Sequence, residues 1–380
     1  MAKYPKLKIN LNVLEQNARI LTELCARHQI QTAGVVKGCG GLVPCGQAMV
    51  RGGCRQIASS RIENLRQIKE ADGTIDTMLI RIPMISELDE VVAYADYSLV
   101  SEKPVLDGLE NCAARIGRSH KVVLMYDLGD LREGVFDRKE FVQLALYVEE
   151  NLKSVQLAGI GTNLSCYGSI VPTSENMGEL ADAAKEIEEK IGRSLELVSG
   201  GATTVLPLLV REGLPEGINH LRLGESILST LDLPALWNCT IDGLSPEAFT
   251  LEAEIIECNA KPTHPIGELG VAAFGKKKTF VDRGVRKRAI LAIGNMDLGD
   301  ACRMIPEDEQ MKVLGASGDH TIVDIQDCDK SYQVGDIAAF HLVYQGIVYS
   351  CLAPTVTKEF ISEEERYESN GISQRRTDHR

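Results

Sequence analysis

The sequence lacks an apolar run long enough to cross a membrane, and it lacks a positive net charge. Its 380 residues carry 54 acidic against 41 basic side chains, which gives a formal net charge of −13. This balance argues against nucleic acids and anionic membranes as partners. The basic start, Met1–Lys6, is not followed by an apolar segment, so no signal peptide is expected. We therefore expect a cytoplasmic protein that acts on a small molecule.

Paired cysteine motifs are also missing. The 11 cysteines are scattered singly, no C-x-x-C pair occurs, and the seven histidines are dispersed. Structural zinc sites need clustered cysteine and histidine ligands. We therefore expect reduced thiols, as in a cytosolic protein, and no metal site.

A repeated strand-then-helix pattern occupies the first two thirds of the chain, where mostly apolar segments alternate with amphipathic ones. The eight predicted strands are Thr32–Val36, Gln56–Ser59, Thr77–Ile82, Tyr97–Val100, Lys121–Tyr126, Leu157–Thr162, Leu195–Ser199 and His220–Leu223. A further helix is expected from Asn12 to His28. Eight such units predict an α/β protein with a TIM-type barrel over residues 10–235.

Sequence signals also mark where some of the helices begin and end. Ser60–Glu63 and Asp137–Glu140 resemble capping boxes, which predict two helix starts. Gly192 and Gly213 fit the ends of two helices.

From about residue 240 the pattern changes to short strands separated by Gly, Pro and Asp. The predicted strands are Thr250–Cys258, Lys278–Asp282, Ala289–Ile293, Thr321–Ile325, Ile337–Leu342 and Ile347–Ala353. This pattern indicates a mainly antiparallel β domain over residues 240–358, joined by residues 1–9, whose strand Lys6–Leu11 could add to it. The polar stretch 361–380 is predicted to be disordered.

Lys37 ends the first predicted barrel strand and is followed at once by Gly38, Gly40 and Gly41. A lysine that is desolvated at a strand end loses pKa and becomes a better amine nucleophile. Such a lysine suits a Schiff base with pyridoxal phosphate, and the glycines would let a bulky ligand approach the backbone. The alternative is a lysine at a strand end that points into water.

The ends of the seventh and eighth predicted strands offer matching chemistry. After Ser199, the run Gly200–Thr204 combines backbone N–H groups with hydroxyls before a helix, which predicts a phosphate cradle. A glycine-rich turn with a helix cap is the alternative. Arg222 would donate a hydrogen bond to the pyridine nitrogen and keep it unprotonated, or it forms a surface salt bridge. Strands five and six run into Arg132 and Asn163 at the same end of the barrel.

Five segments resemble the alanine racemase family of fold-type III pyridoxal phosphate enzymes. They are A-G-V-V-K-G (33–38), D-L-G-D-L-R-E-G (127–134), G-I-G-T-N (159–163), V-S-G-G-A-T-T (198–204) and L-R-L-G-E (221–225). The resemblance spans about residues 5–355. The segment Gly315–His320, a G-x-S-x-D-H run, is similar to the ornithine and lysine racemase branch.

The resemblance implies a role for each matched residue and a homodimer with shared active sites. Lys37 would carry the cofactor and act as acid and base on one face of Cα. Arg222 would pair with the pyridine nitrogen. The residues implied in holding the rest of the cofactor are Ser199, Gly201, Thr203 and Gly224 for the phosphate, Arg132 near the phenolic oxygen and the substrate carboxylate, Asn163, and Tyr344 from the β domain.

The chain departs from the family at the second acid/base. Alanine racemases carry a catalytic tyrosine where this chain has Asn295, and an amide cannot shuttle a proton at useful pH. Asp319 and His320 are the candidates for this role, although His320 could equally be structural. The residues held in reserve are Asp297, Cys302 and Cys166.

The sequence thus favours a racemase of a basic amino acid such as ornithine or lysine. Asp297, Asp300 and Glu225 could receive the distal ammonium group. The alternatives are an alanine or broad-specificity racemase, an aldolase or decarboxylase on the same fold, a non-catalytic pyridoxal-phosphate homeostasis protein, and a barrel enzyme acting on phosphorylated sugars without this cofactor. A D-threonine aldolase would need a metal cluster that the sequence does not offer. The β domain argues against the homeostasis protein, which resembles the barrel alone.

Overall fold

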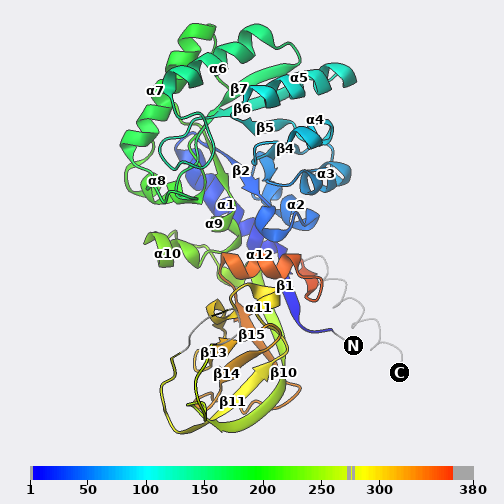
Figure 1. The fold of residues 1–380 in the computed structure, drawn as a ribbon, viewed down its shortest axis with the longest axis vertical. Helices are drawn as coiled ribbons and strands as arrows, with labels where there is room; N and C mark the ends of the chain where they lie inside the picture. The colour runs from blue at the N-terminus through cyan, green and yellow to red at the C-terminus, as the bar shows by residue number, and fades with distance from the viewer. Residues whose placement is uncertain (1–2, 272–274, 276–278, 363–380) are drawn as a thin grey trace, which may run out of the picture. The chain divides into compact units, whose positions relative to one another are not determined.

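The computed structural model describes residues 3–271, 275 and 279–362, and these form two compact units. One unit comprises Leu14–Ile227 and Asp232–Leu244. The other joins the chain up to Val13 with Leu228–Leu231 and with the chain from Ser245 onward. Figure 1 shows the elements of both.

The first unit is a closed barrel of eight parallel strands in chain order, so the predicted fold class is confirmed. Its strands are β2 (Gln31–Val35), β3 (Gln56–Ser59), β4 (Asp76–Leu79), β5 (Tyr97–Val100), β6 (His120–Met125), β7 (Val155–Gly161), β8 (Leu197–Ser199) and β9 (His220–Leu223). The ring closes where β9 pairs with β2, with Gln31 opposite His220.

Helices follow the strands and cover the outside of the barrel (Figure 1). They are α1 (Leu11–Arg27), α2 (Val43–Arg51), α3 (Ile62–Ala71), α4 (Leu88–Tyr94), α5 (Lys103–Ile116), α6 (Arg138–Asn151), α7 (Ser174–Ile191), α8 (Leu206–Glu212), α9 (Glu225–Leu228) and α10 (Asp232–Trp237). Within the described ranges, no helix combines the length and the apolarity that crossing a bilayer would require.

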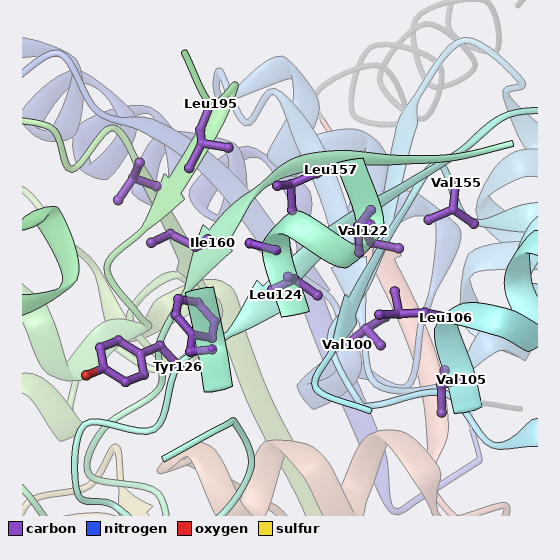
Figure 2. Close-up of a cluster of buried hydrophobic side chains, with 14 of the residues drawn as sticks. Val100, Val105, Leu106, Val122, Leu124, Tyr126, Val155, Leu157, Ile160 and Leu195 are labelled. Atoms are coloured by element: carbon purple, nitrogen blue, oxygen red, sulfur yellow. The ribbon is translucent and has the colours of Figure 1, made fainter. Parts of the chain in front are cut away.

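Alternating residues of the strands build two separate hydrophobic layers. Along β6, Val122 and Leu124 belong to the layer between strands and helices, which Figure 2 shows together with Tyr126. Val123 and Met125 belong to the smaller cluster inside the barrel. This follows from the two-residue period of a strand, whose neighbouring side chains point to opposite faces.

Three of the four predicted helix signals act as expected, including Gly213, which follows the last residue of helix α8, and one does not. The Asp137 carboxylate accepts hydrogen bonds from the backbone N–H groups of Lys139 and Glu140 at 2.8 and 3.0 Å, and Gly192 ends α7 in the left-handed conformation. The capping box predicted at Ser60 is wrong. Helix α3 begins one residue later than that box requires, after Arg61, and no side chain caps it.

The second unit is a mainly antiparallel sheet in the order β12-β15-β10-β11-β14-β13. The strands are β10 (Phe249–Pro262), β11 (Val285–Leu291), β12 (Ile305–Pro306), β13 (Lys312–Ala316), β14 (Thr321–Asp324), β15 (Ile337–His341), β1 (Lys6–Asn10) and β16 (Thr357–Ile361). The predicted N-terminal strand is confirmed, because β1 pairs antiparallel with β10 and parallel with β16. Two helices complete this unit, α11 (Asn295–Leu298) and α12 (Tyr344–Leu352).

Three expectations for this unit need correction. The predicted strand Ile347–Ala353 lies mostly in helix α12, which buries Gly346, Ile347, Ser350 and Cys351. A short apolar run fits a buried helix as well as a strand, and this burial pattern is helical. Residues 279–282 form no strand, and Lys278 lies outside the described residues. Residue 361 ends β16, and residues 363–380 of the predicted tail lie outside the described residues.

We expect Gly159→Ala to destabilise the barrel. A Cβ at this position in β7 would lie 1.8 Å from the carbonyl oxygen of Leu197 in β8, so the two strands would have to separate. Overpacking of this kind costs about 1–3 kcal/mol of unfolding free energy, measurable by urea unfolding. Gly178→Ala is the matched control, because a Cβ at that position in α7 meets nothing within 4 Å. The control should stabilise the protein by about 0.5–1 kcal/mol, and equal effects of the two variants would refute the packing explanation.

Candidate active site at the carboxyl ends of the barrel strands

The candidate site is built where the parallel strands end, because their carboxyl ends meet at one mouth of the barrel. Lys37 follows β2 in a short 3-10 turn, Lys37–Cys39. Thr162 follows β7, Ser199 is the last residue of β8, and Arg222 lies on β9.

The Lys37 side chain reaches solvent but is surrounded by barrel atoms. Burial lowers the pKa of its amine below the usual range, and the positive charges of Arg132 and Arg222 lower it further, against the opposing effect of Cys166 and Glu133. A larger fraction of the amine is therefore uncharged and nucleophilic near neutral pH.

Gly41, in the turn after Lys37, has a local packing role. Its φ is +73°, and a Cβ there would lie 2.3 Å from the Cγ of Asn64 in α3. The left-handed backbone and this close approach both require glycine. Packing within the protein thus accounts for this glycine, which the sequence had linked to access for a ligand.

Arg222 is a buried cation, with 3% of its surface exposed. Its Nη2 donates to the Thr162 carbonyl oxygen at 2.8 Å, and its Nη1 donates to the Ser199 hydroxyl. In the described part of the chain, no carboxylate forms an ion pair with it. Burial lowers the pKa of the guanidinium to about 10, so it stays charged at neutral pH. The surface salt bridge considered from the sequence is therefore not what the structure contains.

The Ser199 hydroxyl continues this contact into the barrel. Its Oγ lies 2.8 Å from Nδ1 of His220, and Nε2 of His220 lies 3.2 Å from Oε1 of Gln56. Because β2 separates β9 from β3, His220 and Gln56 can meet only inside the barrel. The sequence analysis missed both residues. Their signal was available, since each is a polar residue at the start of a buried barrel strand.

Arg132 lies in the loop after β6 and forms a bidentate ion pair with the adjacent Glu133, with one contact at 2.6 Å. The hydrogen bonds that Arg132 donates to Glu133 raise the pKa of Arg132, so its positive charge is held firmly. In the same loop, the Asp127 carboxylate accepts from the backbone N–H groups of Gly129 and Leu131 at 2.9 and 3.1 Å. The loop is therefore fixed by its own carboxylates.

Asp130 fixes the loop that follows β7. Its carboxylate accepts from the N–H groups of Ser165 and Tyr167, both at 2.9 Å, and these bonds lower its pKa although burial opposes the shift. The loop begins with two buried polar atoms that have no hydrogen-bond partner, Thr162 Oγ1 and Asn163 Nδ2. Unpaired buried polar atoms are costly and mark places where a polar group could bind.

The predicted phosphate cradle has the backbone that close approach requires. Gly201 has φ +124°, and a Cβ at Gly224 would lie 2.8 Å from the Cβ of Val35. Neither position accepts a side chain without strain. The hydroxyl of Thr203 donates to the Ser226 hydroxyl at 3.1 Å and accepts from the Ser226 N–H at 3.2 Å, which ties the two loops of the cradle together.

Glu225 follows the cradle and carries an unusual carboxyl group. Burial raises its pKa to about 7, with a further contribution from Asp232, while the positive charge of Lys37 opposes the shift. The carboxyl therefore changes charge near neutral pH. This titration could not be read from the sequence.

The remaining predicted residues belong to the β unit. Asp319 and His320 are exposed in the turn between β13 and β14. The start of α11 is bonded to this turn, because the N–H of Asn295 donates to the Ser317 carbonyl oxygen at 2.9 Å. The structure thus brings Asp319 and His320 to the segment of Asn295. Tyr344 is the first residue of α12.

Among the described residues, no three His, Cys, Asp or Glu side chains gather around one point. No disulfide joins any two cysteines in the described part of the chain.

Comparison with known proteins gives a consistent family. Residues 9–230 match the family model described as the N-terminal domain of alanine racemase. The chain is 39% identical to the ornithine racemase of Acetoanaerobium sticklandii over 358 residues, which cover 94% of this chain and all of that protein. It is 40% identical to the lysine racemase of Thermotoga maritima over 360 residues, which cover 95% and 98% of the two chains.

Solved structures agree on the fold. The alanine racemase from D-cycloserine producing Streptomyces lavendulae has a TM-score of 0.75 at 17% identity, covering 97% of this chain and 99% of that one. The D-threonine aldolase from Filomicrobium marinum has a TM-score of 0.68 at 14% identity, covering 92% and 89%. Both the barrel with its second, antiparallel unit and the near full-length relatives lead to one assignment: this chain is a member of the alanine racemase family.

Proposed function

We propose that the protein is a cytoplasmic, pyridoxal-phosphate-dependent racemase that interconverts the L and D forms of a basic amino acid. The observation that carries this proposal is Lys37, a lysine at a barrel strand end whose amine has a lowered pKa beside two arginines. The choice of ornithine or lysine rests on the names of the two relatives with about 40% identity.

The residues at the barrel mouth fit the cofactor. Thr162 Oγ1 and Asn163 Nδ2 are buried without partners, and Arg222 is a buried cation without a carboxylate. Lys37 would bind the aldehyde carbon, and Arg222 would donate to the pyridine nitrogen. The groups that would hold the remaining atoms are Arg132, Asn163, Gly201, Thr203, Gly224 and Tyr344. When bound, pyridoxal phosphate supplies an electron sink that makes the Cα proton of an amino acid acidic.

The chain's own residues would then exchange the proton. The Lys37 amine takes or returns the Cα proton on one face, which its lowered pKa favours near neutral pH. Arg222, charged and fixed by two hydrogen bonds, keeps the pyridine nitrogen unprotonated, which limits side reactions. Arg132 offers a held positive charge to the substrate carboxylate.

Racemisation requires a second acid/base on the opposite face of Cα. We assign it to the Asp319–His320 turn, supplied across a subunit interface in a homodimer with shared active sites. A carboxylate or an imidazole can exchange protons near neutral pH, whereas the amide of Asn295 cannot.

The activity itself is tested by chiral chromatography after incubation with a panel of L-amino acids. We expect formation of D-ornithine or D-lysine and a visible yellow colour from the cofactor. Borohydride reduction should fix the pyridoxyl group on Lys37, as peptide mapping would show. Lys37→Ala should lose racemisation by at least about a thousandfold, because it removes both the attachment point and one acid/base. A colourless wild-type protein, or conversion of alanine only, would contradict the proposal.

Glu225→Gln tests whether this carboxyl selects a basic substrate. Above pH 7 the Glu225 carboxylate is charged and attracts a distal ammonium, and the attraction is lost as the pH falls through about 7. We expect the kcat/KM ratio of ornithine to norvaline, which lacks the distal ammonium, to drop roughly fivefold in the variant. In the wild type this ratio should also fall between about pH 8 and 6, and in the variant it should be flat. A variant that keeps both the ratio and its pH slope would exclude Glu225 from substrate selection.

Mixed dimers test the shared active site. His320→Ala and Lys37→Ala homodimers should each be impaired, since every site lacks one acid/base. Co-expression of the two variants should restore roughly a quarter of wild-type activity, because half the dimers are mixed and each mixed dimer has one intact site. His320→Ala alone should lose Cα deuterium exchange with one enantiomer more than with the other. Unchanged activity of both His320→Ala and Asp319→Asn, or a fully active monomer by light scattering, would disprove this assignment.

A further inference from the structure

His220 and Gln56 lie deep in the barrel below Arg222, and the proposed mechanism gives neither of them a role. Both are buried, with 1% and 6% of their surface exposed. Burial, with a contribution from Arg222, lowers the pKa of His220 to about 3, so the imidazole is neutral at physiological pH. A neutral imidazole has one donor and one acceptor nitrogen, and this makes the direction of each hydrogen bond readable.

The direction of this series of hydrogen bonds follows from Gln56. We assign the Gln56 amide with Oε1 facing Nε2 of His220 at 3.2 Å, and with this assignment Nε2 carries the hydrogen and Nδ1 is an acceptor. The Ser199 hydroxyl, 2.8 Å from Nδ1, must then donate to it. With its hydrogen used in this way, Ser199 Oγ presents lone pairs, and one of them accepts from Nη1 of Arg222. The bonds run in one direction, from Arg222 through Ser199 and His220 to Gln56.

This order leaves Ser199 without a hydrogen to give to a phosphate. The oxygens of a phosphate dianion only accept hydrogen bonds, and the one hydrogen of Ser199 is committed to His220. The predicted role of its hydroxyl in holding phosphate therefore competes with a bond that the structure shows.

We propose that Ser199, His220 and Gln56 form a positioning relay that aims the Arg222 guanidinium, and that the Ser199 hydroxyl does not bind the phosphate. The inference rests on the proposed function, because Arg222 needs a ring nitrogen to address. The relay gives Arg222 an oriented, neutral hydrogen-bond acceptor, whereas the usual partner of a buried guanidinium is a carboxylate. Because the acceptor carries no charge, the positive charge of Arg222 is not neutralised. The charge and the remaining N–H groups stay available to the cofactor.

The barrel contains a natural control for this relay. Ser98 Oγ on β5 lies 2.8 Å from Nε2 of His120 on β6, both residues are buried, and burial lowers the pKa of His120 to about 4. The second pair thus repeats the chemistry and burial of Ser199 and His220. It differs in that the serine contacts Nε2 and not Nδ1 of the histidine, and in that neither of its members bonds to an arginine.

Ser199→Ala is tested against Ser98→Ala on the holoenzyme. We expect Ser199→Ala to lower kcat by roughly tenfold or more, with little change in KM, and to increase formation of pyridoxamine phosphate as a side product. Ser98→Ala should leave kcat and side product unchanged while showing a similar loss of thermal stability. Equal catalytic effects of the two variants would overturn the relay.

Cofactor affinity separates the two roles of Ser199. The preference of the apoenzyme for pyridoxal phosphate over pyridoxal is measured by fluorescence titration. If Ser199 positions Arg222, the preference stays within about twofold of wild type in Ser199→Ala. A drop of about tenfold in Ser199→Ala would return Ser199 to the phosphate and refute the proposal. A wild-type protein that binds neither compound would instead refute the proposed function.

Two further measurements test His220 and Gln56, the residues of the relay farthest from Arg222. Gln56→Leu should lower kcat in the same direction as Ser199→Ala, and the double variant should lose less than the sum of the two single effects, because both act through one chain. In the unmodified protein, 15N NMR with labelled histidine should show His220 in the Nε2–H tautomer without titration between about pH 5 and 9. Additive effects, or an Nδ1–H tautomer, would disprove the directional relay, and the NMR readout needs no variant to fold.

Discussion

The buried positive charge of Arg222 is the constraint on which the rest of the barrel mouth depends. A guanidinium removed from water is expensive unless hydrogen bonds replace its hydration, and a carboxylate is its usual partner. Here the described chain supplies a carbonyl oxygen of Thr162 and the hydroxyl of Ser199 instead. Neither neutralises the charge, so it remains available to a ligand. The unpaired atoms of Thr162 and Asn163 lie at the same strand end, which is consistent with a site completed by a polar group.

The same charge organises its surroundings. It helps lower the pKa of His220 and of Lys37, so one residue stays a neutral hydrogen-bonding link and the other becomes a better base. Glu225 shows the opposite tendency, because burial, with a contribution from Asp232, raises the pKa of its carboxyl to about 7. The mouth of the barrel therefore combines fixed positive charges, one amine whose pKa is lowered and one carboxyl that titrates near neutral pH. Strongly shifted pKa values cluster at functional sites, where they suit groups that exchange protons.

The pairs Ser199–His220 and Ser98–His120 show that the role of a residue pair depends on where it lies in the fold. Each couples a serine to a buried histidine at 2.8 Å within the same barrel. One stands beside an arginine at the carboxyl end of the strands, where barrel enzymes carry their sites, and the other does not. Neither the residue types nor their spacing distinguishes the two pairs. Their neighbours across the ring of strands do.

The sequence by itself determined the barrel, the β unit and the strand-end positions of Lys37, Ser199 and Arg222, because apolar periodicity and glycine placement are local properties of the chain. It predicted a strand where helix α12 forms, because a short apolar run fits a buried helix and a buried strand equally well before packing is known. Only the tertiary structure joined His220 to Gln56, 164 residues apart, and gave the Ser199 hydroxyl to His220. The physical reason is that hydrogen-bond direction and pKa depend on what closes around a group, and barrel closure places β3, β8 and β9 around one interior.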